Sequence, residues 1–419
     1  MSGFVKSLKC IDCGREYPPD DLLSACKECG QRGLGFGLLD PVYDYSQISK
    51  KVNKGILEDR KPSVWKYREF LPISHESKIV SLTEGGTPLM KCEPLAEQLG
   101  TSSLYVKNET VNPTFSFKDR AFTVIITRAC EKGANIVAAV SDGNAGSSAA
   151  AYSAKAGITC YIFTPAFAVS SKIVQMSMYG ARVFSVKGSL IEAGMLVLEA
   201  CNKYGWFNIT TAKVLNPYQT EGHKTLAYEI CEQLGWQAPD WVITPVASGD
   251  SLGAIWKGFK EFHALGFIRS LPRMVGVQGE GAAPLVKAFE EEKEFYEVEP
   301  FEPETIADAL CIGMVLGSWP LNTLKESNGY AAAVPDAEIL EAQSLLATRE
   351  GIFCEPSSAT TIAGLRRLLS KGVISKNETV VCVTTGSGLK VLEVASQVCT
   401  KPVQLEPNIS ELEKVLASQ

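Results

Sequence analysis

Short β-rich runs alternate with longer helical patterns along most of the chain, from about residue 78 onward. Strands are predicted at 104–106, 136–140, 160–163, 182–186, 241–245, 274–278 and 379–383. Helices are predicted at 119–132, 144–156, 191–204, 222–234, 252–265 and 336–350. Because strands that alternate with helices form parallel sheets covered on both faces, the sequence predicts an α/β fold with doubly wound parallel sheets.

The composition is that of a folded protein and argues against two classes of partner. Of 419 residues, 45% are hydrophobic and 21% are charged, so the chain can bury a large core and falls outside the class of disordered proteins. A net charge of -6 without a long basic run argues against nucleic acid. No stretch reaches about 18 uncharged apolar residues, and the N-terminus lacks the apolar region of a signal peptide. We therefore expect a soluble, cytoplasmic protein that does not bind membranes.

Four of the 13 cysteines are regularly spaced near the N-terminus. Cys10 and Cys13, then Cys26 and Cys29, form two C-x2-C pairs, each followed by a glycine, which is typical of a tetrahedral zinc site. Four thiolates leave no open coordination position, so we expect a structural zinc ion in a zinc-ribbon-like segment at residues 1–35. Two disulfides, which a reducing compartment disfavours, and a redox or catalytic use of the thiols are the weaker alternatives.

Three loops that open into predicted helices carry residues suited to chemistry, since ligands of open α/β sheets bind past the strand ends. The loop at 112–120 places Lys118 at a helix start, where the helix dipole and burial favour the neutral amine. The loops at 141–148 and 247–253 offer small residues and exposed amides, suited to a carboxylate and a phosphate. A turn at 384–388 adds hydroxyl groups. Taken singly, these features also fit a surface lysine and ordinary helix caps.

Together these loops resemble those of the fold type II pyridoxal-phosphate-dependent enzymes (the tryptophan synthase beta superfamily), and most closely the threonine synthases. The resemblance is carried by EGGTPL at 84–89, NPTFSFKDR at 112–120, SDGNAGSSAAAY at 141–152, NPYQTEGHKT at 216–225, the strand, loop and helix at 241–262, GIFCEPSSA at 351–359 and TGSGLK at 385–390. It extends to the N-terminal ribbon. It implies a large cofactor-binding domain at 36–100 and 216–419, a smaller mobile α/β domain at 101–215, and a homodimer.

The resemblance assigns roles position by position. Lys118 corresponds to the Schiff-base lysine and catalytic base, Asn144 to the asparagine at the phenolic oxygen of pyridoxal 5'-phosphate, and Thr385 to the hydroxyl at its pyridine nitrogen. Further cofactor contacts are implied for Phe117, Ala247, Ser248, Gly249, Asp250 and Ser251. Substrate contacts are implied for Thr87, Ser116, Ser141, Gly143, Ala145 and Lys213. A hydroxyl beside the pyridine nitrogen suits elimination and replacement better than transamination.

The chain departs from the family pattern at positions that surround the substrate. Family glycines are replaced by Phe115 and Ala121, and the glycine- and asparagine-rich phosphate loop is replaced by residues 247–251. An Asn-Ser pair is replaced by Lys213 and Val214, an arginine by Gln219, and a histidine by Ser387. Several of these family positions recognise the phosphate of O-phosphohomoserine, so the changes remove charge-assisted hydrogen bonds. Lys213 could supply a point charge in their place.

Asp142 has two interpretations. Threonine synthases carry a hydroxyl residue at this position, whereas the diaminopropionate ammonia-lyases carry a similar T-D-G-N run in which the aspartate is a second base. Asp142 therefore either binds an ammonium group or takes a proton from the substrate, or it caps the following helix.

The sequence thus predicts a pyridoxal-phosphate-dependent lyase or synthase that acts on a small amino acid, with the threonine synthase reaction as the nearest activity. Lys118 would abstract the α-proton, a β or γ leaving group would depart, and water or another nucleophile could add. One alternative is an ammonia-lyase, dehydratase or β-replacement enzyme for diaminopropionate, serine or threonine, favoured by the lost arginine. Another is an inactive binding paralogue, suggested by Asp250 in the phosphate loop but opposed by the retention of Lys118, Asn144 and Thr385.

Overall fold

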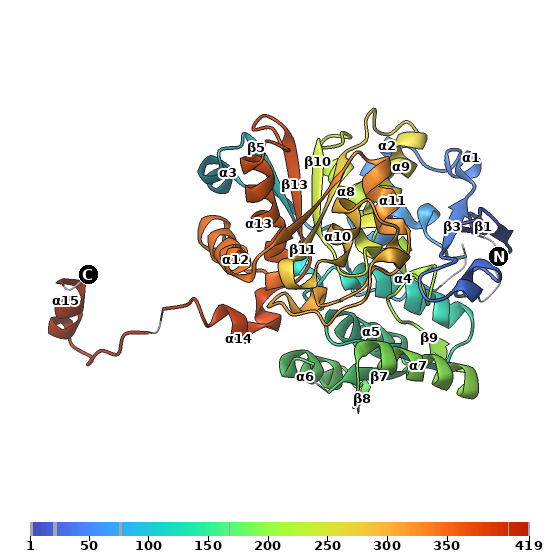
Figure 1. Cartoon of the computed structure of the whole chain (residues 1–419), viewed down its shortest axis with the longest axis horizontal. Helices are drawn as coiled ribbons and strands as arrows, with labels where there is room; N and C mark the ends of the chain where they lie inside the picture. Colours follow the sequence, from blue (N-terminus) through green and yellow to red (C-terminus); the bar gives the residue numbers. More distant parts are fainter. Residues whose placement is uncertain (1–2, 20–22, 75–77, 167, 401, 418–419) are drawn as a thin grey trace.

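Three sheets organise the chain in the computed structural model, which describes residues 3–19, 23–74, 78–166, 168–400 and 402–417. Positions 1–2 and 20–22 of the expected ribbon lie outside the described residues. Figure 1 shows the large sheet above the small one, with the N-terminal sheet at one end of the body.

The large sheet has six strands in the order β12-β11-β10-β13-β5-β4. Their bounds are β4 (Leu89–Lys91), β5 (Ser103–Asn108), β10 (Trp241–Pro245), β11 (Arg273–Gly279), β12 (Tyr330–Val334) and β13 (Thr379–Thr384). Five strands are parallel and β4 is antiparallel to β5. Alternate residues of β10 enter opposite cores, since Val242 and Ile243 belong to different apolar clusters. This alternation shows that helices cover both faces of the sheet.

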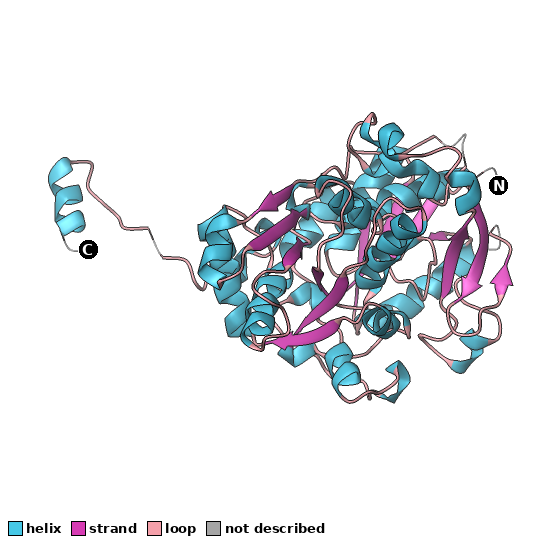
Figure 2. Ribbon diagram, turned by 90° about the horizontal axis from the view of Figure 1, so that it is seen from above, coloured by secondary structure: helices cyan, strands magenta, loops and turns pink. Residues whose placement is uncertain are grey.

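Each face of the large sheet has its own helices. The first apolar cluster packs residues of α8 (Thr225–Gln233), α9 (Asp250–Ala264), α10 (Pro284–Glu290) and α11 (Trp319–Glu326) on one face. The second cluster packs α3 (Glu93–Leu99), α12 (Asp336–Glu350) and α13 (Pro356–Ser370) on the other. Figure 2 shows the strands enclosed between these helices.

The small sheet has four parallel strands in the order β8-β7-β6-β9. Their bounds are β6 (Ile136–Val140), β7 (Thr159–Pro165), β8 (Arg182–Val186) and β9 (Phe207–Asn208). One face packs on α4 (Lys118–Glu131), α5 (Asn144–Ala156) and α6 (Ser170–Met178), and the other on α7 (Leu190–Tyr204). The α/β, doubly wound prediction is therefore confirmed for both sheets.

The N-terminal sheet is antiparallel, in the order β2-β1-β3, with β1 (Val5–Cys10), β2 (Glu16–Tyr17) and β3 (Leu39–Tyr43). The short helices α1 (Tyr45–Ile48), α2 (Lys54–Glu58) and η2 (Val64–Phe70) follow it. At the other end of the chain, α14 (Leu392–Ala395) leads to an extended segment and to α15 (Ile409–Ala417), which projects from the body (Figure 1). Within the described ranges, no helix is both long and apolar enough to cross a membrane.

Several sequence predictions match the observed bounds closely, and other observed elements were not predicted. The strands at 136–140, 182–186 and 241–245 and the helices at 144–156 and 336–350 have the predicted ends. β12 and α13 were not predicted. The division into a large and a smaller mobile domain stays a prediction, and β5, which falls within the range 101–215, belongs to the large sheet.

Candidate functional site

Lys118 is the first residue of α4 and lies near the carboxyl ends of strands from the large sheet and the small sheet. The residue before it, Phe117, donates its backbone N–H to the carbonyl of Thr385 (2.8 Å), and Ser116 forms a β-bridge with Gly386. Within the described residues, the Lys118 amine has no hydrogen bond or ion pair, and it lies 4.8 Å from the centre of the Phe117 ring. A lysine without a counter-ion at a helix start is available to react.

The charge state of Lys118 follows from its surroundings. Burial lowers the pKa of the Lys118 ammonium, because the charged form loses its hydration. Three carboxylates act against that shift, those of Asp250, Asp142 and Glu355. The amine is therefore more readily neutral than a surface lysine, as a nucleophile or base requires.

A buried ion cluster fixes α4 beneath Lys118. Arg120, which is fully buried, donates hydrogen bonds to Glu109 (2.6 and 2.8 Å) and Glu229 (2.7 and 2.8 Å). Lys107 on β5 donates to Glu229 (2.7 Å), so two cations balance two carboxylates. Thr87, an expected substrate contact, donates its hydroxyl to Glu109 and accepts from Arg120 within this cluster. The cluster thus joins α4 to the large sheet, and the Thr87 hydroxyl is engaged in it.

Asp119, the residue after Lys118, holds the loop that precedes Lys118. Asp119 accepts hydrogen bonds from the backbone N–H (2.7 Å) and the hydroxyl (2.6 Å) of Thr114. Burial raises the pKa of Asp119 to about 6, against the opposing effect of these bonds. Phe115 adopts a left-handed conformation, with φ of 66°, at a position where the resembled family has glycine.

Asn144 begins α5 and faces the same space from the small sheet. Its amide nitrogen donates to both oxygens of Glu355 (3.1 and 2.9 Å), while its buried amide oxygen has no partner within the described residues. Glu355 lies in the GIFCEPSSA motif at 351–359, but the sequence did not predict it as a site residue. A buried acid at the start of α13, between an apolar run and Pro-Ser-Ser, was the signal for it.

Thr385 follows β13 and is oriented by Ser358. The Ser358 hydroxyl oxygen accepts from the backbone N–H groups of Thr385 (2.8 Å) and Gly386 (3.0 Å) and lies 2.9 Å from the Thr385 hydroxyl. With both lone pairs occupied by these N–H groups, Ser358 cannot also accept from Thr385, so its own proton goes to the Thr385 oxygen or to the Gly386 carbonyl (3.4 Å). The proton of Thr385 is then left to point toward an acceptor in the site.

The loop after β6 places Asp142 directly before the start of α5, and its role stays a prediction. Ser141 accepts hydrogen bonds from the N–H groups of Gly143 (3.1 Å) and Gly146 (2.8 Å), and the cap residue of α5 is Gly143. The helix start is therefore capped by Ser141, and no capping bond from Asp142 is present among the described residues. Burial raises the pKa of Asp142, opposed by the charges of Lys172 and Lys118. This half-buried carboxylate is suited to exchanging protons.

The loop after β10 has the shape of a phosphate cradle. Gly249 has φ of 88°, and a side chain there would collide with Pro320. It leads into α9, whose first backbone N–H groups have no partner within the helix. Asp250 turns one carboxylate oxygen to the backbone N–H of Lys213 (3.0 Å) and the amide of Gln219 (3.0 Å). Burial raises the pKa of Asp250, opposed by the Lys213 backbone N–H and by the charges of Lys213 and Lys118.

Lys213 is less available than its position in the sequence suggested. Its ammonium is buried, pairs with Asp40 (2.7 Å) and lies 4.0 Å from the centre of the Trp319 ring. Asp40 is 173 residues away in the chain, so the sequence pattern could not reveal this pairing. The substrate role of Lys213 stays a prediction that its buried ion pair does not favour.

Two further lysines, not predicted, approach the site from α6 and the 388–390 turn. Lys172 pairs with Asp308, and its side chain packs against Gly143, where a Cβ would lie 2.6 Å from it. Lys390 donates to the Thr114 carbonyl (2.9 Å) and to Gln175 (2.7 Å), and burial lowers its pKa to about 8.

Some of the buried polar atoms without partners belong to residues of this site, which allows a test of the cofactor that the resemblance implies. Within the described residues they include atoms of Ser116, Asn144, Gln219 and His223. His223 stacks on Phe117 (4.6 Å between ring centres), and burial lowers its pKa, so the ring is neutral. Unpartnered buried polar atoms are uncommon in proteins and indicate a ligand site. With a free lysine, a hydroxyl with an outward proton and a helix-start cradle, the residues fit pyridoxal phosphate.

The four N-terminal cysteines are brought together as predicted. The sulfur atoms of Cys10, Cys13, Cys26 and Cys29 all lie within 4.8 Å of one another. Four thiols at this separation fit a tetrahedral ion such as Zn²⁺. No other group of this kind occurs in the part of the chain that the structure describes.

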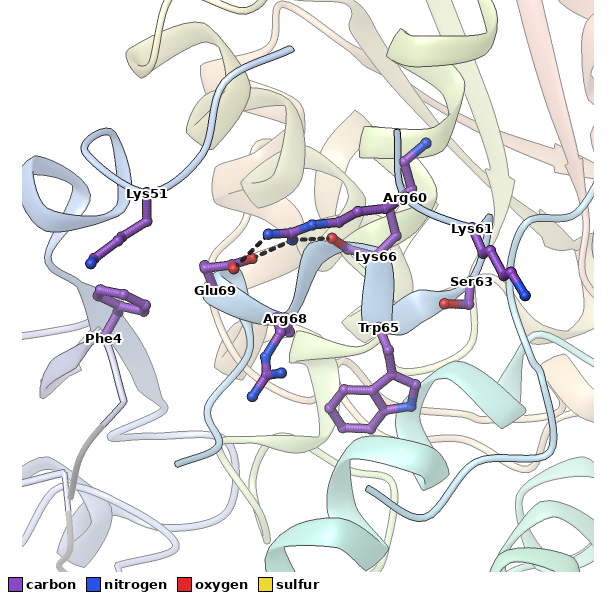
Figure 3. A pocket seen from close by; sticks show the side chains of 9 residues that line it. All are labelled: Phe4, Lys51, Arg60, Lys61, Ser63, Trp65, Lys66, Arg68 and Glu69. Atoms are coloured by element: carbon purple, nitrogen blue, oxygen red, sulfur yellow. Dashed lines mark hydrogen bonds and ion pairs between the residues drawn. The ribbon is translucent and has the colours of Figure 1, made fainter. Parts of the chain in front are cut away.

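A surface hollow of about 710 Å³ lies at η2 and takes no part in this arrangement. Its lining residues are Phe4, Lys51, Arg60, Lys61, Ser63, Trp65, Lys66, Arg68 and Glu69 (Figure 3). Arg60 forms a two-pronged pair with Glu69 (2.7 and 2.8 Å) across it, and Lys66 pairs with Glu232. None of its lining residues belongs to the cluster around Lys118.

Comparison with known proteins gives consistent results. Residues 80–386 match the family model described as "Pyridoxal-phosphate dependent enzyme". The chain is 46% identical to the threonine synthase of Methanocaldococcus jannaschii over 97% of this chain and 98% of that one. It is 44% identical to the threonine synthase of Methanosarcina acetivorans, over 98% of each.

Solved structures share the fold at lower identity. The processed threonine deaminase isoform 2 of Solanum lycopersicum superposes with a TM-score of 0.62 at 23% identity, covering 75% of this chain and 88% of that one. The L-serine ammonia-lyase of Rhizomucor miehei gives a TM-score of 0.64 at 19% identity, covering 74% and 96%.

Proposed function

The chain belongs to the pyridoxal-phosphate-dependent enzymes of fold type II, in their threonine synthase-like group, and from that premise we propose that it eliminates or replaces a side-chain group of a small amino acid, with Lys118 as the catalytic base. The first candidate reaction is that of threonine synthase, from O-phosphohomoserine to threonine. Relatives of that name at 44–46% identity, matched over nearly their whole length, support it.

The cofactor would be held by residues of both sheets. Lys118 would hold its aldehyde carbon, Asn144 its phenolic oxygen, Thr385 its pyridine nitrogen, and the 247–251 loop its phosphate. When bound, pyridoxal phosphate withdraws electrons from the α-carbon of an amino acid, which makes loss of the α-proton and of a leaving group possible.

The chain's own groups then account for the proton transfers. Lys118, whose pKa is lowered by burial and whose amine has no ion pair among the described residues, would take the proton from the α-carbon at its Nζ. Thr385 would donate a hydrogen bond to the pyridine nitrogen without transferring its proton, which would favour elimination and replacement over transamination. The N–H groups around Ser141, Gly143 and Ala145 suit the substrate carboxylate, and Ser116 offers an unpartnered hydroxyl. Asp142 can exchange a proton at the other side of the substrate.

One observation carries the proposal. The amine of Lys118 has no partner among the described residues, and it lies where β6, β10 and β13 end, among buried polar groups whose hydrogen bonds are incomplete. Purified protein loaded with pyridoxal phosphate should show the visible absorbance of lysine-bound cofactor, and Lys118→Ala should lose it together with at least 10³-fold of activity. Lys155→Ala, at an exposed position on α5, is the matched control and should keep both. If the absorbance is absent from the loaded wild type, the enzyme is excluded and a binding paralogue is favoured. If it survives in Lys118→Ala, Lys118 is not the residue that holds the cofactor.

A second candidate, an ammonia-lyase, dehydratase or β-replacement enzyme for an unphosphorylated amino acid, is favoured by the groups that surround Gln219. The amide of Gln219 binds Asp250, and the ammonium of Lys213 is neutralised by Asp40. Lys213, Gln219 and Asp250 form one wall of the site. Among the described residues, this wall therefore presents a carboxylate and an amide, and it has no unpaired cation that could bind a substrate phosphate.

Product analysis separates the two candidates. Wild-type protein is incubated with O-phosphohomoserine, O-phosphoserine, diaminopropionate, serine or threonine, and phosphate and ammonia are measured. Phosphate release with threonine formation supports the first candidate, and ammonia release from an unphosphorylated substrate supports the second. In the second case Gln219→Arg should raise kcat/KM for O-phosphohomoserine by about tenfold or more, the value of one charge-assisted hydrogen bond.

We also propose a structural Zn²⁺ ion at the four cysteines, a homodimer and a cytoplasmic location. The four-thiol donor set supports the first, and resemblance to the family supports the others. Metal analysis should find one zinc per chain, lost in Cys13→Ser. Sedimentation should give twice the chain mass of 45.3 kDa.

A further inference from the structure

The N-terminal sheet and its cysteine loops, here called the ribbon (residues 3–19 and 23–43), extend past the expected 1–35 because β3 ends at Tyr43. The ribbon lies directly against the loop at 213–221, which borders Lys118. We infer that the ribbon positions this loop, with Asp40 and Tyr218 as the positioning residues and the four-cysteine metal centre as the anchor. The part that the loop plays in substrate binding rests on the proposed function, whereas the physical coupling between ribbon and loop does not.

Tyr218 completes the core of the ribbon. Its buried ring packs in one apolar cluster with Leu8, Cys10, Tyr17, Cys26 and Leu39, and its hydroxyl donates to the carbonyl of Pro19. The guanidinium of Arg128, on α4, lies 3.7 Å from the centre of the same ring. A segment of about 40 residues buries little apolar surface, and such segments are usually stabilised by a metal ion or by contacts with the rest of the protein. Here the Tyr218 side chain supplies such a contact. Tyr218 is thus shared between the ribbon and the body.

Asp40 ties the last strand of the ribbon to the loop by charge. On β3, it pairs with Lys213 (2.7 Å) and with Lys257 (3.0 Å). Lys257 in turn pairs with Glu221 (2.8 Å), which accepts a hydrogen bond from Tyr43 (2.6 Å). Breaking such a buried pair leaves a charge without a partner, which is strongly unfavourable. The loop therefore cannot move away from β3 without a large cost.

A second contact runs through Trp319, which covers the cradle. Its ring packs with Leu38 of the ribbon and with Val214 of the loop, beside Ile11. Ile11 lies within the first cysteine pair, and so does Asp12, which accepts hydrogen bonds from the Gly37 backbone N–H (2.6 Å) and the Ser318 hydroxyl (3.0 Å). The geometry of the metal site thus sets the position of the surface on which the loop rests.

The loop and the residues that follow it also contact residues around Lys118. Lys213 N–H and the Gln219 amide end on Asp250, and Gly222 touches the Arg120 backbone on α4. His223 stacks on Phe117, the neighbour of Lys118. A displaced ribbon would therefore change this side of the site first, while Asn144 and Thr385, which are held by Glu355 and Ser358, would stay in place.

The test compares holoenzyme with bound Zn²⁺ and holoenzyme treated with a chelator, by hydrogen exchange at constant visible absorbance. We expect faster exchange at 213–221 as well as in the ribbon, with 136–165 unchanged. Unchanged protection at 213–221 while ribbon amides exchange freely would overturn the inference. So would protein that binds no Zn²⁺ at these thiols. Neither outcome bears on whether Lys118 catalyses a reaction, so the two proposals fail separately.

A second measurement serves if chelation unfolds the protein. Coupling is reciprocal, so loosening the loop must also loosen the metal. Tyr218→Phe, which removes one buried hydrogen bond, should release Zn²⁺ to a chromophoric chelator about fivefold faster. It should also raise KM with kcat within about twofold, since the wall binds substrate and Lys118 is undisturbed. The matched control is Tyr204→Phe, at an exposed tyrosine. A zinc release rate equal to that of the control would refute the coupling.

Discussion

At the scale of single residues, the site combines groups that local pattern reveals with groups that it cannot. Lys118, Asn144 and Thr385 each follow a strand or open a helix, and parallel sheets bring such positions to one edge. Glu355 and His223 depend on contacts with residues far away in the chain, as does the engagement of Lys213 by Asp40. No local pattern encodes those pairings.

Phe115 holds strain that a substitution can release. Its left-handed backbone is fixed by hydrogen bonds to Asn112 (2.8 Å) and from Ser387 (3.0 Å). Phe115→Gly should therefore be more stable than Phe115→Ala by about 1 kcal/mol, because only glycine adopts this conformation without a steric penalty. Urea unfolding of both variants measures the difference. Equal stabilities would show that the backbone is relaxed.

Asp119 should make stability depend on pH below neutrality. Burial raises its pKa from 3.8 to about 6, so the folded protein holds this proton more tightly than the unfolded chain. The resulting stabilisation is complete below about pH 4 and is lost as the pH rises through 6. Between pH 5 and pH 7, wild type should lose about 1 kcal/mol relative to Asp119→Asn, which cannot titrate. Thermal unfolding at both pH values measures this, and parallel curves would contradict it.

At the scale of elements, helices and strands were predicted correctly where the hydrophobic periodicity is bounded by turn-forming residues. The strand at 136–140 and the helix at 144–156 are separated by Ser-Asp-Gly, which ends one pattern and starts the next. β12 reads YAAAV, and alanine has little preference for strands. α13 is buried on nearly all sides, so it lacks the one-sided pattern that reveals a helix.

The contact of η4 (Gln219–Glu221) with α4 has no spare room. A methyl group on Gly222 would collide with the Arg120 carbonyl oxygen. Gly222→Ala should push the loop away from α4, lower the stability by about 2 kcal/mol and raise KM. Gly55→Ala, within α2, meets no atom closer than 3.5 Å and is the control. Thermal unfolding and steady-state kinetics check both, and a Gly222→Ala protein like wild type would show that η4 yields easily.

At the scale of the whole molecule, the body and the C-terminal tail differ in how they are held. Lys390 is buried and bonded to two elements, whereas α15 has no buried residue and projects from the body (Figure 2). Ending the chain after Val398 should leave the cofactor absorbance unchanged and the midpoint of thermal unfolding within about 2 °C. A fall of many degrees would show that the tail packs on the body or on a second copy.

The strand order of the large sheet determines when this sheet can be completed during biosynthesis. β13 lies between β10 and β5, so the pair of β4 and β5 joins the other strands only through it. β13 is synthesised after β4, β5, β10, β11 and β12, and until it emerges the growing chain holds two unconnected pieces of the large sheet. The same strand delivers Thr385 and the carbonyl that receives the Phe117 N–H. A nascent chain therefore cannot assemble the site until β13 emerges, and a product that terminates before β13 has a divided sheet rather than a weakened enzyme.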